Sequence, residues 1–192
     1  MNNFTDDLVT KYIGGSGYRE IVKPFIFWTE WMDNHGSGVP IYCMDKLVID
    51  FASIPWPFKM IWPKDGDYNQ ATVPHDLLYK TKGFVFDPRK EIRVETFRKN
   101  KIFGGVRFKQ VIQGFPIYRF TRKETDFVFR NAMEIIDKHT DYNIPGYQRE
   151  IMFRAVRTNF PAGWKLTKED YILRDQFDDK AFMEFFKEPP AS

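Results

Sequence analysis

The sequence has 192 residues, a formal net charge of +3 and one cysteine, Cys43. This length allows one well-buried core, so we expect a single domain over residues 1–192. One cysteine excludes an internal disulfide framework and a cysteine-based zinc cluster, and so small a net charge does not imply a polyanionic partner. We find no secretory signal and no apolar run of about eighteen residues, so we expect no transmembrane segment.

The N-terminal part of the chain predicts strands preceded by an arm. Residues 1–20 are mostly polar, and we expect them to form a flexible arm that ends in the glycine-rich turn at 12–18. A phosphate- or metal-binding loop is the alternative for that turn. Residues 21–55 are rich in aromatic and β-branched types, for example in Phe25–Trp28, and predict a small antiparallel sheet.

The middle of the chain predicts an inserted β-hairpin at residues 82–118, with Gly104 and Gly105 as its turn. From residue 96 to residue 123 the chain has eight Lys and Arg residues and no Asp or Glu, and aromatic residues alternate with the charges. Such a segment can bind single-stranded nucleic acid. We favour a hairpin with one face on the core and one in solvent, and then a protein-binding arm, so nucleic acid is not the expected partner.

Helical patterns occur at residues 70–80, 121–139, 145–160 and 167–188. In the second of these, Thr121 and Glu124 form a capping box, and Phe129 and Ile136 lie on an apolar stripe. Asp126 falls on the same stripe, where a buried carboxylate needs a partner. The last segment is acidic and has four Phe residues, which the core or another chain must cover. Together these segments predict an α+β fold: a small N-terminal antiparallel sheet, a core of three to four helices and an inserted basic hairpin.

A possible site arises where the first two helices meet. His75 and Tyr79 are four residues apart and share a helix face, whereas Asp76 points about a quarter turn away. Asp126 of the second helix can accept the imidazole N–H, fix its tautomer and stabilise an imidazolium. Asp76 can bind a hard cation through oxygen. The candidate catalytic residues are His75, Asp126 and Tyr79, and the candidate ligands of a divalent cation such as calcium are Asp76 and Asp50.

The same side chains have a structural interpretation. Asp126 could satisfy His75 and Tyr79 in a buried polar network that holds the two helices together. A His-Asp dipeptide is common, so the spacing leaves both interpretations open.

Four blocks of the sequence resemble a family of uncharacterised proteins from phages and prophages. These blocks are Ile49–Pro55, His75–Tyr79, Asp126–Met133 and Met152–Arg157, and the similar region covers roughly residues 40–160. The family's spacing between the tyrosine and the later aspartate is shorter, so residues 82–118 resemble an enlarged hairpin. The resemblance implies a phage protein in the host cytoplasm during assembly, or in the virion. Its implied partners are other phage structural proteins or further copies of itself.

A more distant resemblance is to the phospholipase A2 superfamily, in which a helix with His-Asp-x-x-Tyr packs antiparallel to a helix with one aspartate. It implies that His75 is the general base for water, Asp76 a calcium ligand, and Asp126 with Tyr79 the supporting network. The superfamily's Gly-x-Gly calcium loop has no counterpart between residues 56 and 74.

Two functions follow from these resemblances. The first is a phage-encoded, metal-assisted hydrolase similar to phospholipase A2. The alternative is a non-catalytic virion or tail component, which uses the basic aromatic hairpin and the Phe-rich C-terminal helix for protein–protein contacts.

Overall fold

A computed structural model describes residues 3–14, 17–32, 38–49, 68–100, 106–139 and 144–159, and describes no side chains at 31, 32, 99, 100, 106, 107, 158 and 159. The strands are β1 (Val9–Ile13), β2 (Tyr18–Lys23), β3 (Phe25–Met32), β4 (Gly38–Cys43), β5 (Val48–Ile49), β6 (Phe84–Phe86), β7 (Arg93–Asn100), β8 (Val106–Gln113) and β9 (Pro116–Arg119). The helices are α1 (Asn69–Lys80), α2 (Arg122–His139) and α3 (Gly146–Asn159). This combination of helices and antiparallel strands confirms the predicted α+β class.

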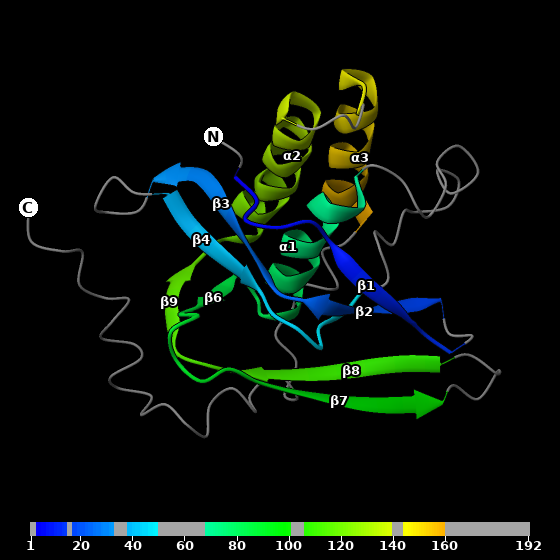
Figure 1. The fold of residues 1–192 in the computed structure, drawn as a ribbon. Coiled ribbons are helices and arrows are strands. Elements are labelled where there is room, and N and C mark those ends of the chain that lie inside the picture. Colours follow the sequence, from blue (N-terminus) through cyan, green and yellow to red (C-terminus); the bar gives the residue numbers. More distant parts are fainter. Residues whose placement is uncertain are drawn as a thin grey trace, which may run out of the picture.

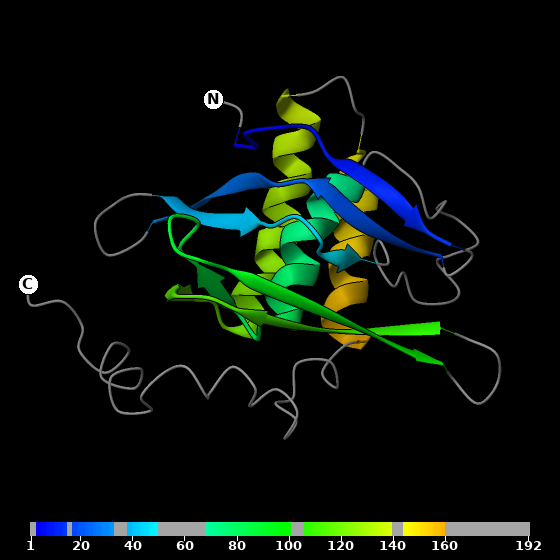
Figure 2. The same ribbon diagram turned by 60° about the horizontal axis from the view of Figure 1, so that its bottom comes forward.

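The fold has a layer of strands over a group of helices. In Figure 1 the three helices stand next to one another, and the turned view in Figure 2 places the strands in front of them. α1 packs against α2 and α2 against α3, while β4 contacts α1 and β3 contacts α2. The core between the layers includes Ile21, Phe25, Phe27, Ile41, Leu47, Val73, Leu78, Phe129, Ala132, Met133 and Ile136.

The described strands form four small antiparallel sheets: β1-β2-β5, β3-β4, β6-β9 and β7-β8. The β3-β4 pair shows the alternation expected of a sheet with one face on a core. Phe25 and Phe27 are buried, whereas Trp28 is exposed. Phe27 lies opposite Ile41 of β4, which is also buried. This face of the sheet therefore packs against α1 and α2.

The prediction of a flexible arm at residues 1–20 is wrong. Phe4 is buried and forms an isolated β-bridge with Phe27. β1 pairs with β2, and the paired residues Ile13 and Tyr18 flank the glycine-rich segment. The polar composition is misleading because β1 is an edge strand with largely solvent-facing side chains, and such a strand needs few apolar residues.

The inserted segment 82–118 forms two nested ribbons instead of one hairpin. β6 pairs with β9, and β7 pairs with β8 in an unbroken register from Arg93–Gln113 to Asn100–Val106. A turn at Asp87 and Pro88 separates β6 from β7: the Asp87 carboxylate accepts a hydrogen bond from the Arg89 backbone N–H at 3.0 Å, as turn-forming aspartates do. The predicted turn at Gly104 and Gly105 lies outside the described residues.

Three of the four predicted helices lie in described parts of the chain, and each begins within one residue of its predicted start. The capping box is present: the Thr121 N–H donates to Glu124 Oε2 at 2.7 Å, and the Glu124 N–H donates to Thr121 Oγ1 at 3.3 Å. The predicted strand residues 50–55, with Asp50, and the predicted helix 167–188 fall outside the described residues. None of the described helices is both long enough and apolar enough to cross a membrane.

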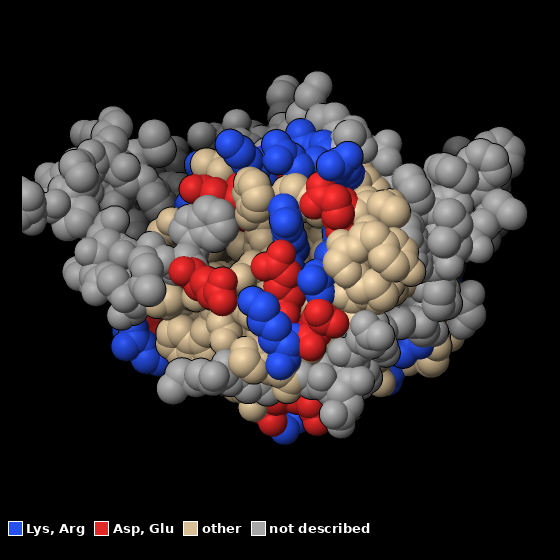
Figure 3. Space-filling view, turned by 90° about the horizontal axis from the view of Figure 1, so that it is seen from above, with Lys and Arg blue, Asp and Glu red and all other residues tan. Residues whose placement is uncertain are grey.

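The face seen from above mixes charges of both signs (Figure 3). Ion pairs of both signs also join α2 and α3. Arg130 Nη1 of α2 lies 3.6 Å from Glu150 Oε2, and Arg149 of α3 pairs with Asp137. Such interspersed charge gives this face no large field of one sign, unlike the basic stretch of the inserted segment.

Candidate active site

α1 carries His75 and Tyr79 on one face, one turn apart. Their ring centroids are 4.5 Å apart, with an angle of 39° between the ring planes. Pro74 lies inside the helix directly before His75. It has no N–H to donate to the carbonyl of Gln70, and an interior proline typically costs about 3 kcal/mol. The helix is therefore not optimised for helical stability at the position next to His75.

The end of α1 determines how α2 meets it. Gly83 has a φ of +89°, and a Cβ at this position would lie 1.9 Å from the carbonyl oxygen of Phe120. The Gly83 N–H donates to the Leu78 carbonyl at 2.7 Å, and the Phe120 N–H donates to the Gly83 carbonyl at 2.9 Å. Because α2 begins at Arg122, this contact places the first turn of α2 beside the last turn of α1, and the two helices pack antiparallel.

α2 brings Asp126 to the two aromatic side chains of α1. The Tyr79 hydroxyl donates a hydrogen bond to Asp126 Oδ1 at 2.7 Å, which confirms the predicted contact between Asp126 and the pair. His75 Nε2 lies 3.6 Å from the same oxygen, which is longer than a hydrogen bond but within range of an ion pair. His75 is 7% exposed and Asp126 is 2% exposed, so this pair is almost fully buried, whereas Tyr79 is only partly buried.

Asp76 lies on the other side of the imidazole. Its Oδ1 is 3.6 Å from His75 Nδ1, and its side chain is 16% exposed, against 3% for the side chain of Asp126. The imidazole of His75 therefore lies between a deeply buried carboxylate and one nearer the surface. All four described candidate residues come together, as the spacing predicts.

The two carboxylates control the ionisation of His75. Burial lowers the pKa of the imidazole, but the two nearby carboxylates of Asp126 and Asp76 favour its charged form and together outweigh burial, so the pKa of His75 is raised from 6.5. Burial also raises the pKa of Tyr79 to about 12, with Asp126 adding to this effect and Arg122 opposing it. Tyr79 is therefore a neutral hydrogen-bond donor at physiological pH, and the cluster favours a charged imidazolium.

Two members of the cluster were missed by sequence reasoning. Arg122 Nε donates to the Tyr79 hydroxyl at 3.4 Å, and Arg122 Nη2 donates to the Arg157 carbonyl of α3 at 2.6 Å. Phe129 packs its ring against His75, with 5.1 Å between centroids. The sequence does contain a signal that identifies Arg122 as a neighbour of Asp126, because the two residues are four positions apart and share a helix face.

A calcium ion needs six to eight oxygen ligands, and the described residues do not supply such a set. In the described part of the chain, no group of three or more His, Cys, Asp or Glu side chains is arranged to hold a metal ion. Asp76 is the candidate ligand that lies beside His75, and Asp50 falls outside the described residues. The described donor set therefore does not fit calcium on its own.

The arrangement suits proton transfer through the imidazole. Within the described part of the chain, His75 Nε2 is buried and makes no hydrogen bond, and it faces Asp126. A buried nitrogen without a hydrogen bond carries a desolvation cost that a purely structural contact would avoid. Protonation of His75 creates a charged partner for Asp126, so the cluster stabilises the imidazolium that a general base becomes.

The family comparison covers this whole arrangement. The family model described as protein of unknown function (DUF1353) matches residues 31–156, which include α1, α2 and the ribbon of β7 and β8. No curated protein and no solved structure matches the chain. Because the family model spans more than half of the chain, the protein belongs to the DUF1353 family.

Proposed function

We propose that this member of the DUF1353 family is a phage-encoded hydrolase of carboxylic esters in which His75 is the general base. The observation that carries the proposal is the shared contact of Tyr79 and His75 with one oxygen of Asp126, at 2.7 and 3.6 Å. A buried carboxylate behind an imidazole, fixed by a tyrosine hydroxyl, resembles the helix pair of the phospholipase A2 superfamily.

The proposed reaction uses Nδ1 of His75. Nδ1 takes a proton from a water molecule, and the resulting hydroxide adds to the ester carbonyl carbon. When the tetrahedral intermediate collapses, the imidazolium returns this proton to the leaving alkoxide, so His75 ends the cycle neutral. Positioned general bases contribute roughly 10²–10⁴-fold to a rate.

Asp126 and Tyr79 act in this proposal as positioning residues. The Asp126 carboxylate lies on the Nε2 side of the imidazole and stabilises the positive charge that forms after proton abstraction. Tyr79 holds the carboxylate in place through its hydroxyl. The described donor set does not fit calcium, so no step of the reaction above depends on a divalent cation.

The experiment compares the full-length parent with His75→Gln, which removes the base and preserves most of the side-chain volume. Hydrolysis of aryl, short-chain and glycerol esters is measured with added calcium and with a chelator. We expect His75→Gln to lower kcat/KM by about 100-fold or more, the lower limit for a general base. Tyr147→Phe, at an aromatic that is 68% exposed on α3, is the matched control and should leave the rate unchanged.

The pH dependence of the parent is a second readout. Only neutral imidazole accepts a proton, and the pKa of His75 is raised from 6.5. The rate should therefore rise with pH through a single ionisation above 6.5. If the parent hydrolyses every ester in this panel no faster than His75→Gln, the proposal fails.

A second candidate function is a non-catalytic phage particle component, and exposed aromatic residues favour it. Phe97 is 46% exposed and Phe115 is 48% exposed, both in the inserted segment, and Trp28 on β3 is 41% exposed. Exposed aromatics of this kind are typical of protein interfaces. Light scattering of the full chain over increasing concentration tests self-association, the form of assembly that needs no further protein.

A further inference from the structure

A cavity lies beside the turn that joins β4 to β5. Its volume is about 390 Å³, which is within the range of small-molecule sites. It is lined by the end of β4 and this turn, and by the connection between β6 and β7 with the start of β7. The lining includes no residue of the cluster around His75. The cavity is therefore a second place for a ligand, separate from the helix contact.

The cavity has an apolar part. Met44 in the lining is 2% exposed, and Ile92 and Val94 are half-buried. Tyr42 is also half-buried, and its phenol offers a ring and a hydroxyl together. An apolar group of a ligand would be removed from water against these side chains.

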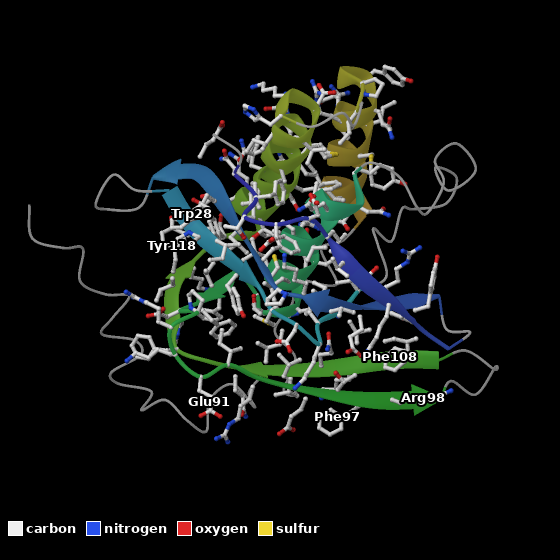
Figure 4. The ribbon with its side chains drawn as sticks, viewed as in Figure 1. Trp28, Glu91, Phe97, Arg98, Phe108 and Tyr118 are labelled. Atoms are coloured by element: carbon white, nitrogen blue, oxygen red, sulfur yellow. The ribbon has the colours of Figure 1, made fainter. Side chains whose placement is uncertain are left out.

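Two of the five charged residues of the lining offset each other. Arg93 Nε lies 2.8 Å from Glu91 Oε1, and the pKa of Arg93 is raised by Glu91 and more weakly by Glu95. Glu91 does not line the cavity, and Figure 4 shows its side chain pointing away from the body of the protein. Arg93 and Glu95 are therefore engaged with charges of their own segment, which leaves three charged residues of the lining for a ligand.

These three residues are Asp45, Lys46 and Lys90, and they carry both signs of charge. None of them makes an ion pair within the part of the chain that the structure describes. Burial raises the pKa of Tyr42, and the charge of Asp45 adds to this effect, so the carboxylate lies near the phenol. The cavity thus offers an anionic group and two cationic groups beside an apolar surface.

Lys46 is held at the cavity in a strained backbone conformation. Its φ is +61°, in the left-handed region that glycine and asparagine adopt more easily than lysine. Its N–H donates to the Ile21 carbonyl at 2.9 Å, and its carbonyl accepts a hydrogen bond from Gln110 Nε2 at 2.9 Å. Contacts from β2 and β8 therefore maintain the strain. Strain of this kind is concentrated at functional sites, and a lysine here serves a ligand better than it serves folding.

Independently of the proposed hydrolysis, we propose that this cavity binds a small zwitterion with an apolar side chain, the chemistry of a free apolar α-amino acid. Lys46 and Lys90 bind its carboxylate, Asp45 and the Tyr42 hydroxyl bind its ammonium group, and the apolar part of the lining covers its side chain. Charge-assisted hydrogen bonds of both signs give the specificity. A simple anion would meet the like charge of Asp45, and a simple cation would meet the like charge of two lysines.

An NMR titration of the full ¹⁵N-labelled chain with four probes tests the proposal. Leucine has all three features of the ligand. Glycine lacks the apolar side chain, N-acetylleucine lacks the ammonium charge, and leucinamide lacks the carboxylate. We expect leucine to shift the amide signals of Lys46 and Ile92. Each of the other probes should bind about tenfold more weakly or worse, because it leaves one part of the lining without its counterpart.

Lysine variants connect the binding to the cavity. Lys46→Asn removes one ammonium group and relieves the left-handed strain, so we expect it to raise the Kd for leucine about tenfold without lowering Tm. Lys90→Gln removes the second ammonium group without changing the turn and should weaken leucine binding in the same direction. Lys138→Gln, at an exposed lysine in the last turn of α2, is the matched control and should leave the Kd unchanged.

Four outcomes overturn the proposal. The first is that leucine shifts no amide signal of the cavity lining. Binding of N-acetylleucine as tight as that of leucine would identify an anion site, and equally tight binding of leucinamide would identify a cation site. Leucine binding that both Lys46→Asn and Lys90→Gln leave intact would place the ligand elsewhere. If Lys46→Asn does not fold, Lys90→Gln decides this last comparison alone.

Discussion

Polar side chains have opposite roles in two regions of the molecule. One region is the contact between α1 and α2, and the other is the ribbon formed by β7 and β8. In the helix contact, His75 and Asp126 are buried ionisable groups, and the partly buried Tyr79 donates to the same carboxylate oxygen that His75 approaches. In the ribbon, one uncharged side chain, Gln110, pairs with backbone groups, and the aromatic Phe97 is left in solvent. Buried ionisable groups are expensive unless they are paired, whereas an exposed aromatic has little effect on stability. The helix contact therefore encloses its ionisable groups, whereas the ribbon leaves an aromatic side chain half exposed.

Removing the carboxylate that organises the helix contact should have the largest effect. Asp126→Ala leaves the Tyr79 hydroxyl and the His75 imidazole without their buried partner, which should lower the free energy of unfolding by about 3–5 kcal/mol. Asp126→Asn keeps an acceptor for Tyr79 and should cost clearly less. Chemical denaturation of both variants measures the difference, and equal losses would show that the negative charge has no role.

The tyrosine in the same contact should have the next largest effect. Tyr79→Phe removes one hydroxyl that donates to Asp126 at 2.7 Å and preserves the ring against His75. A hydrogen bond to a charged group contributes about 1.5–3 kcal/mol, and we expect a loss of that size. Tyr147→Phe removes a hydroxyl from an exposed residue of α3 and should cost nothing measurable. If the two variants unfold at the same denaturant concentration, the Tyr79–Asp126 bond does not stabilise the protein.

The ribbon's attachment should be weaker. Gln110→Ala leaves the buried Val48 N–H without its acceptor and should cost about 1–2 kcal/mol. Gln110→Glu keeps an oxygen for Val48 but cannot donate to the Lys46 carbonyl, so it should fall between the parent and Gln110→Ala. Hydrogen exchange at the Val48 amide measures the local effect directly. Unchanged exchange in Gln110→Ala would mean that other contacts hold the ribbon.

The outer face of the ribbon should have the smallest effect on stability. Phe97→Ser changes a side chain that is 46% exposed, and we expect a change within about 0.5 kcal/mol in either direction. Thermal unfolding of Phe97→Ser beside the parent measures it. A loss comparable with that of Tyr79→Phe would show that Phe97 belongs to the folded core and would erase the contrast between the two regions.

The sequence predicted the helix contact better than the strands because local signals set the helices. Thr121 and Glu124 mark the start of α2 through side-chain hydrogen bonds within one turn, and the spacing of His75 and Tyr79 fixes their common face. Asp126 was expected to need a partner because it lies on an apolar stripe. Each of these arguments depends on residues at most four positions apart or on burial alone.

The missed features depend on contacts between distant residues. β1 lacks an apolar pattern, and its place in a sheet follows from pairing with β2 and from Phe4 against Phe27. The attachment of the ribbon depends on Gln110 and Val48, which are 62 residues apart. No local pattern identifies such a pair in a single sequence, because a glutamine in a strand looks the same whether or not its amide replaces a neighbouring strand.

The most direct test of the central claim is an NMR titration of His75, which needs no substrate. The chain has three histidines, and the signal that is lost in His75→Gln is the signal of His75. We predict that His75 titrates with a pKa above 6.5, because Asp126 and Asp76 outweigh its burial, and that Asp126→Asn lowers this pKa. A His75 that stays neutral down to pH 5, or a pKa that does not respond to Asp126→Asn, would contradict a general base supported by Asp126.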